Sequence, residues 1–137
     1  MGKRVSLIYL VNQKKEILFQ LRDNKPTIPW PNFWGLIGGE IENETPEEAI
    51  IRETIEEINY KLERINKICE TTGIDQLTNK QNLLYFFTGN INLSLSEIRL
   101  NEGQRLSFFN PGEIAIRKIP PIIKKIFQEN REKILYI

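Results

Sequence analysis

The sequence of 137 residues contains no histidine and a single cysteine, Cys69. Without histidine, Ser-His-Asp and Cys-His mechanisms and histidine acid/base catalysis are excluded. One cysteine cannot close an internal disulfide, and with no histidine beside it there is no Cys/His zinc site. An enzyme with this composition must therefore use carboxylates, lysine, tyrosine or a metal ion.

Excess charge and long hydrophobic runs are also lacking. Nineteen basic residues oppose 18 acidic ones, so the chain lacks the basic excess typical of a nucleic-acid-binding domain. No apolar run approaches the roughly 20 residues of a membrane span, and the start leads into an alternating strand instead of a signal-peptide core. We therefore expect one domain, 1–137, in the cytoplasm, without a nucleic-acid or membrane partner.

Hydrophobic periodicity predicts strands, a helix, more strands and a closing helix. The strands are expected at 4–11, 16–22, 34–39, 61–70, 81–92 and 105–110, and the helices at 46–58 and 122–134. The first two strands should form a hairpin, and segment 23–33, with three prolines, should be an irregular loop. This order predicts an α+β fold with helices packed on the faces of a sheet.

The first helix carries a cluster of carboxylates. It begins with the capping-box pattern of Thr45 and Glu48. On a helical wheel, Glu53, Glu56 and Glu57 fall within an arc of about 100°, while apolar residues cluster on the opposite side. One face is therefore directed to the core, and the other concentrates negative charge.

This cluster calls for a compensating cation, because carboxylates spaced i, i+3 and i+4 repel one another. Arg52 can reach Glu48 or Glu56, but one guanidinium cannot neutralise the whole cluster. Oxygen-only ligands suit a hard ion such as Mg²⁺. The glycines Gly38 and Gly39 permit a tight turn and let a backbone carbonyl approach such an ion. An isolated E-x-x-E-E pattern is more often a solvated helix face, so the interpretation depends on the surrounding residues.

The surrounding pattern resembles the Nudix box, G-x5-E-x7-R-E-U-x-E-E-x-G-U, where U is a bulky aliphatic residue. Counted from Gly38, its charged positions are matched by Glu44, Arg52, Glu53, Glu56 and Glu57. Three features depart from the family: the loop 40–43 is one residue short, Thr54 occupies an aliphatic position, and Asn59-Tyr60 replaces the final glycine and aliphatic residue. Asparagine tolerates the left-handed conformation that ends a helix, so Asn59 is a plausible substitute. The departures concern loop geometry more than metal chemistry.

The resemblance, which extends to MutT-like members over most of residues 4–127, implies a Nudix fold: a mixed β-sheet sandwiched between α-helices. By position, Glu56 and Glu57 would be metal ligands, Glu53 a further ligand or the base for water, and the Gly38 carbonyl another ligand. Arg52 would orient the glutamates. The implied cofactor is Mg²⁺, with Mn²⁺ as an alternative.

Further site residues are implied outside the box. Glu102 resembles a downstream loop glutamate that contributes to metal binding or catalysis, although an exposed loop acid is an equally good interpretation. Arg22 could meet a phosphate oxygen, and Trp34 or Phe109 could lie near a base. Aromatic residues in such positions belong more often to the core.

Two functions stay open at this point. The first is a Mg²⁺-dependent hydrolase that cleaves the diphosphate linkage of a nucleoside triphosphate or a nucleotide sugar by attack of water on phosphorus. The second is a Nudix-like module that binds a nucleotide without cleaving it. Degenerate modules typically lose the glutamates of R-E-x-x-E-E, which this chain keeps, so the hydrolase is favoured. A homodimer is common among relatives and is also left open.

Overall fold

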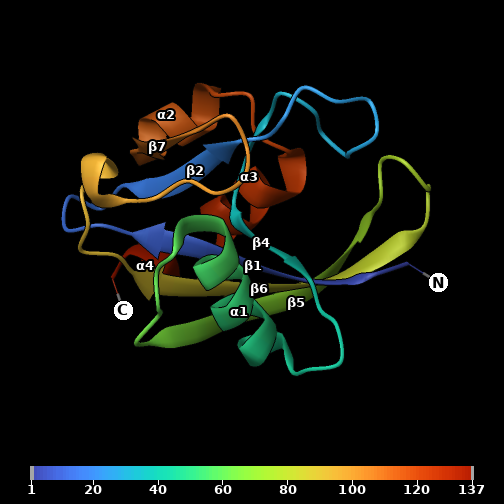
Figure 1. Ribbon diagram of the computed structural model, residues 1–137, viewed down its shortest axis with the longest axis horizontal. Helices are drawn as coiled ribbons and strands as arrows, with labels where there is room; N and C mark the ends of the chain where they lie inside the picture. The colour runs from blue at the N-terminus through green and yellow to red at the C-terminus, as the bar shows by residue number, and fades with distance from the viewer. Residues whose placement is uncertain (1, 137) are drawn as a thin grey trace.

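The computed structural model describes residues 2–136, which form strands, four α-helices and one short 3-10 helix, η1 (Figure 1). The elements follow in the order β1 (Arg4–Val11), β2 (Ile17–Leu21), β3 (Trp34–Gly35), β4 (Ile37–Glu40), α1 (Pro46–Ile58), β5 (Ile65–Ile74), β6 (Gln81–Asn90), η1 (Leu95–Glu97), β7 (Arg105–Phe109), α2 (Pro111–Ile116), α3 (Pro121–Glu129) and α4 (Arg131–Leu135). None of the described helices is long and apolar enough to span a membrane.

The sheet is mixed, and β1 is its centre. β1 pairs in parallel with β6 along its whole length and antiparallel with β4 and the start of β2. β5 extends the sheet beyond β6, and β3 and β7 both pair with β2. As predicted, β1 and β2 form a hairpin.

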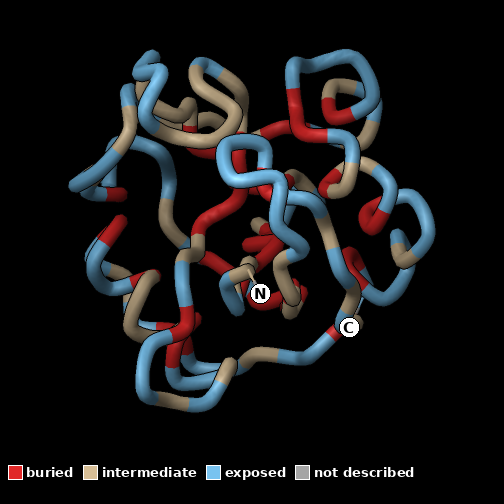
Figure 2. Tube along the Cα trace, turned by 90° about the vertical axis from the view of Figure 1, so that its right-hand side faces the viewer, coloured by how far each residue is buried: buried red, intermediate tan, exposed pale blue. Residues whose placement is uncertain are grey.

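Two hydrophobic cores lie on opposite faces of this sheet because side chains alternate along β1. Tyr9 packs with residues of α3 and α4 in one core, whereas Ile8 packs with Ile50 and Ile58 of α1 in the other. In Figure 2 the buried residues gather along the inner strands and the exposed ones lie on the outer turns. The predicted α+β architecture, a mixed sheet between helices, is confirmed.

Some element boundaries differ from the prediction. The single strand expected over 34–39 is two strands, because Gly35 pairs with β2 whereas Gly38 pairs with β1. The strand expected over 61–70 is shifted to Ile65–Ile74. The closing helix is broken into α3 and α4 at Asn130, whose φ of −127° and ψ of 24° leave the helical region. The helices η1 and α2 were not predicted.

Helix α1 has the bounds that its sequence predicts. The Thr45 hydroxyl accepts a hydrogen bond from the Glu48 amide at 3.1 Å, and the Glu48 carboxylate accepts one from the Thr45 amide at 2.9 Å. The helix ends at Asn59, which has the expected left-handed conformation, with φ of 54°. This capped helix fixes where the glutamates stand.

Candidate functional site

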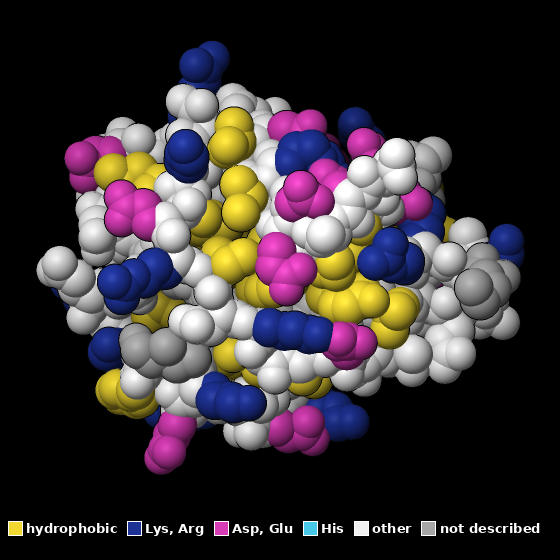
Figure 3. Space-filling model, turned by 90° about the horizontal axis from the view of Figure 1, so that it is seen from below, with side chains coloured by type: hydrophobic (Ala, Val, Ile, Leu, Met, Phe, Trp, Pro, Cys, Tyr) yellow, Lys and Arg dark blue, Asp and Glu magenta, His cyan; other side chains and the backbone are white. Residues whose placement is uncertain are grey.

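A cavity of about 930 Å³ opens beside α1. The carboxylates of Glu53 and Glu56 line it from α1, the glycine pair lines it from β4, and Glu102 lines it from the loop before β7. Acidic and basic side chains are interspersed on the molecular face shown in Figure 3, so this face carries no broad field of one sign.

Glu57 is the most buried carboxylate of the site, with only 4% of the residue exposed. One of its oxygens accepts a hydrogen bond from the Gly38 amide at 2.9 Å. Burial raises its pKa to about 9, and the nearby Glu53 and Glu102 add to the shift, which the Gly38 amide offsets only in part. The protein alone therefore does not provide enough positive charge or hydrogen bonding to stabilise the ionised carboxylate of Glu57.

The glycine pair is required by close packing of β4 against α1 and β1. A Cβ at position 39 would lie 2.6 Å from the carboxyl group of Glu53, so glycine leaves room for that side chain. Gly38 has a φ of +149°, and a Cβ there would overlap the carbonyl oxygen of Ser6. Burial also raises the pKa of Glu53 above its ordinary value. The two glycines thus bring the β4 backbone directly against two of the carboxylates.

Arg52 joins several carboxylates into one network. Its guanidinium lies 2.6 Å from Glu44, 2.8 Å from Glu56 and 3.1 Å from Glu53. It also donates to the carbonyl of Glu40 in β4. The expected contact with Glu56 is confirmed. The shortest ion pair is with Glu44, a partner that the helical wheel could not indicate because Glu44 precedes the helix.

The Arg52–Glu44 pair also has an electrostatic effect. Hydrogen bonding to Arg52 lowers the pKa of Glu44 to about 2, and hydrogen bonding to Glu44 raises the pKa of Arg52 above its ordinary value. Both side chains therefore keep their charges across the ordinary pH range. This pair fastens the loop after β4 to α1.

The loop that carries Glu102 is docked on α1 and β2. The amide of Asn101 donates to the carbonyl of Glu57 at 2.8 Å, and the Asn101 side chain donates to the carbonyl of Glu56 at 3.0 Å. The Glu102 carbonyl accepts a hydrogen bond from the buried side chain of Gln20 at 2.6 Å. Sequence reasoning missed Gln20 and Asn101; the one available signal was a polar residue, Gln20, within an apolar strand.

Arg22 also lines the cavity. Its Nε donates to the carbonyl of Pro29 at 2.9 Å, and the charges of Glu57 and Glu102 act on its guanidinium. Burial lowers its pKa from the ordinary value, although these carboxylates oppose the shift. The structure therefore brings Arg22 together with the glutamates, as a phosphate contact would require.

The structure places Trp34 and Phe109 elsewhere. Phe109 is only 3% exposed and lies in the core between Phe19 and Trp34, with ring centroids 5.5 and 4.9 Å away. Neither Trp34 nor Phe109 lines the cavity, because each packs its ring on the other core aromatics. The tryptophan that lines the cavity is Trp30, in the loop before β3, and sequence reasoning did not select it.

The residues present fit a hard divalent cation by the chemistry of their donors. Within residues 2–136 the side chains do not already form a converged cluster of three metal-ligating groups. The donor set is nevertheless made of oxygens alone, from Glu53, Glu56, Glu57 and Glu102, and the two most buried members have raised pKa values. A divalent cation would supply the positive charge needed to stabilise these carboxylates in their ionised form.

Comparison with known proteins agrees with this architecture. The family model for the NUDIX domain matches residues 1–129, so the chain belongs to the NUDIX domain family. Its class is accordingly a Nudix pyrophosphohydrolase, as the sequence predicted. No curated protein matches the chain in sequence.

Solved structures with low sequence identity share the fold. A MutT protein from Methanosarcina mazei Go1 is 20% identical, with a TM-score of 0.82 and coverage of 96% of this chain and 94% of the other. The NUDIX domain of Shewanella oneidensis NrtR, complexed with ADP ribose, is 14% identical, with a TM-score of 0.78 and coverage of 97% and 88%. An Ap4A hydrolase from C. elegans is 16% identical, with a TM-score of 0.77 and coverage of 96% and 97%.

Proposed function

We propose that this protein is a Mg²⁺-dependent hydrolase that cleaves the diphosphate linkage of a nucleoside diphosphate derivative, either a nucleoside triphosphate or a nucleotide sugar. The observation that carries the proposal is the arrangement of α1 on the cavity. Glu53 and Glu56 line the wall, and Glu57 is buried against the glycine pair. Mn²⁺ is an alternative ion with similar oxygen preference.

Five groups of this chain would hold the ion: Glu53, Glu56, Glu57, Glu102 and the carbonyl of Gly38. When bound, the ion neutralises phosphate oxygens and lowers the pKa of an attacking water. The protein positions this ligand set through two anchors. Arg52 holds the carboxylates of α1 by ion pairs, and hydrogen bonds from Asn101 fix the loop of Glu102 to the end of the helix.

The proton of the attacking water would pass to the carboxylate set. The negative charge of Glu102 adds to the raised pKa of both Glu53 and Glu57, and Glu53 adds to that of Glu57, so the role of base is assigned to no single carboxylate. Arg22 would contact a phosphate oxygen, since it lines the same cavity as Glu53, Glu56 and Glu102 and carries the opposite charge.

The relatives support a nucleotide as the substrate. The NrtR domain is complexed with ADP ribose, and the C. elegans protein is an Ap4A hydrolase. The near balance of 19 basic and 18 acidic residues supports a small-molecule partner over a nucleic acid. With a single cysteine and no internal disulfide to protect, we place this activity in the cytoplasm.

The test is product release from a panel of nucleoside triphosphates and nucleotide sugars with Mg²⁺. Wild-type protein should cleave at least one of them, and Glu57→Gln should lose most of that activity. Glu47→Gln is the matched control, because Glu47 is an exposed residue of the same helix. Cleavage of nothing by wild type would leave the binding module as the better function. Equal cleavage by Glu57→Gln and wild type would refute the role of the α1 glutamates.

A further inference from the structure

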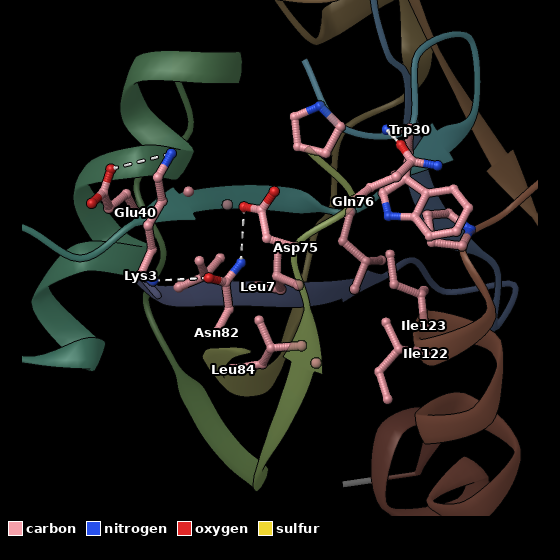
Figure 4. A pocket seen from close by; sticks show the side chains of 18 of the residues that line it. Lys3, Leu7, Trp30, Glu40, Asp75, Gln76, Asn82, Leu84, Ile122 and Ile123 are labelled. Atoms are coloured by element: carbon pink, nitrogen blue, oxygen red, sulfur yellow. Dashed lines mark hydrogen bonds and ion pairs between the residues drawn. The ribbon is translucent and has the colours of Figure 1, made fainter. Parts of the chain in front are cut away.

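At the end of the cavity away from α1, several apolar side chains gather beside Gln76. Figure 4 shows Trp30, Ile122 and Ile123 on the side opposite Lys3 and Glu40. Leu7 and Leu84 form part of the floor between these two sides. An apolar compartment joined to a carboxylate wall suits a ligand with a flat organic group at one end and phosphates at the other.

Trp30 presents an aromatic surface to this compartment. It is half-buried and lines the cavity, whereas Trp34, the other tryptophan, packs against Phe109 and does not. A large aromatic ring left partly open inside a cavity can stack on another planar group without displacing a packed neighbour. The apolar side chains of Ile122 and Ile123 lie on the same side of the cavity.

The conformation of Trp30 is held before any ligand binds. Its backbone has a φ of +52°, and prolines stand on both sides of it in the chain. Its amide donates to the side-chain oxygen of Gln76, in the turn after β5, at 2.5 Å. Its ring packs edge-on against Phe33, with centroids 5.1 Å apart. An aromatic group held in this way loses little conformational entropy on binding.

Trp30 is also linked to the charged end of the cavity. The residue before it, Pro29, accepts the hydrogen bond from Arg22, and Arg22 lines the cavity together with Glu53, Glu56 and Glu102. The same short loop therefore reaches both the proposed phosphate contact and the apolar compartment. A nucleotide with its phosphates at Arg22 would have its base near Trp30.

We propose that Trp30 is a specificity-determining residue that stacks on the base of the nucleotide, and that Gln76 is a positioning residue that holds Trp30 in place. That the ligand is a nucleotide rests on the proposed function. The additional proposal is that its base stacks on the ring of Trp30. The recognised chemistry is a planar, π-bearing base attached to a phosphorylated sugar.

Steady-state kinetics on the substrate found in the panel test this inference. Trp30→Ala should raise KM roughly 10-fold and leave kcat nearly unchanged, because the stacking contact is present in both ground and transition states. Trp30→Phe should restore most of the affinity. Trp34→Phe, the matched control, should leave KM near the wild-type value. An unchanged KM in Trp30→Ala would overturn the proposal.

The role of Gln76 has a separate test. Gln76→Ala removes the acceptor of the Trp30 amide and should raise KM several-fold without changing kcat. Gln76→Glu keeps an acceptor oxygen at that place and should retain the wild-type KM. Equal KM values in all three proteins would remove Gln76 from the proposal.

Fluorescence distinguishes failure of this inference from failure of the proposed function, because it requires no hydrolysis. In Trp34→Phe, Trp30 is the remaining tryptophan, and at least one of ADP, GDP, CDP and UDP should quench its emission. Inorganic pyrophosphate, which lacks a base, should not. The same nucleotides should leave the emission of Trp30→Phe unchanged. Absence of quenching in Trp34→Phe, or equal quenching in both variants, would refute stacking on Trp30 even if the enzyme is active.

Discussion

The glycine pair of β4 allows two neighbouring substitutions to separate catalysis from stability. In Gly39→Ala the new methyl group meets the Glu53 carboxyl at 2.6 Å, whereas ordinary contact begins at 3.4 Å. The carboxylate must therefore move by about 0.8 Å, and a misplacement of about 1 Å can cost about 100-fold in rate. We expect kcat to fall by about this factor. The cost in stability should stay near 1 kcal/mol or less, because the displaced group is the end of a flexible side chain.

Gly38→Ala should behave in the opposite way. Its methyl group would meet the backbone of Ser6 and Leu7 in the middle of β1, and its φ of +149° is unfavourable for alanine. Backbone at a sheet centre cannot move as a side chain can, so we expect a loss of about 3 kcal/mol or more in unfolding free energy.

The assay for both variants is the kcat of diphosphate hydrolysis together with urea unfolding. Gly112→Ala is the control, since its methyl group would be 3.4 Å from the nearest atom, the Asn110 side-chain oxygen. It should keep both kcat and stability near wild type. If Gly39→Ala keeps wild-type kcat, or if it unfolds as readily as Gly38→Ala, the contact between Gly39 and Glu53 does not have the role assigned to it.

Three further outcomes are expected. Burial raises the pKa of Glu57 from 4.5 to about 9, so the metal-free protein should lose stability as the pH rises through that interval. In urea unfolding, Glu57→Gln should reduce the dependence of the unfolding free energy on pH. An equal pH dependence in wild type and Glu57→Gln would contradict the shift. Glu44→Gln weakens the 2.6 Å ion pair of Arg52 and should lower kcat/KM by about 10-fold in hydrolysis kinetics, whereas wild-type kinetics would show that the pair is dispensable. Phe109→Ala should lower the unfolding free energy by about 3 kcal/mol, measured by thermal or urea unfolding, and leave the KM of the folded protein unchanged. A raised KM would indicate that Phe109 contacts the substrate after all.

The parts of the site that depend on local rules were predictable from sequence. The capping box of Thr45 and Glu48 depends on residues three apart, and the wheel that gathers Glu53, Glu56 and Glu57 depends on helical geometry alone. Both features therefore appear in the structure within the predicted helix.

Contacts between distant segments could not be read in the same way. The Gly38–Glu57 hydrogen bond joins residues 19 apart and exists because β4 packs against α1. Whether Trp30 or Trp34 lines the cavity depends on the positive φ values of Trp30 and Asn32, which the sequence does not signal because neither residue is glycine. It also depends on the hydrogen bond from Trp30 to Gln76, which is 46 residues away in the chain. Sequence periodicity places both tryptophans near the strand that follows the proline-rich loop but does not say which ring faces the cavity.

We have proposed that the glutamates of α1 form the metal site of this Nudix hydrolase. Binding of Mn²⁺, followed by electron paramagnetic resonance as the loss of the free-ion signal, tests it without any assumption about the substrate. Wild type and Glu47→Gln should bind the ion equally, and Glu57→Gln should bind it at least about 10-fold more weakly. Equal binding by Glu57→Gln and wild type would contradict the claim.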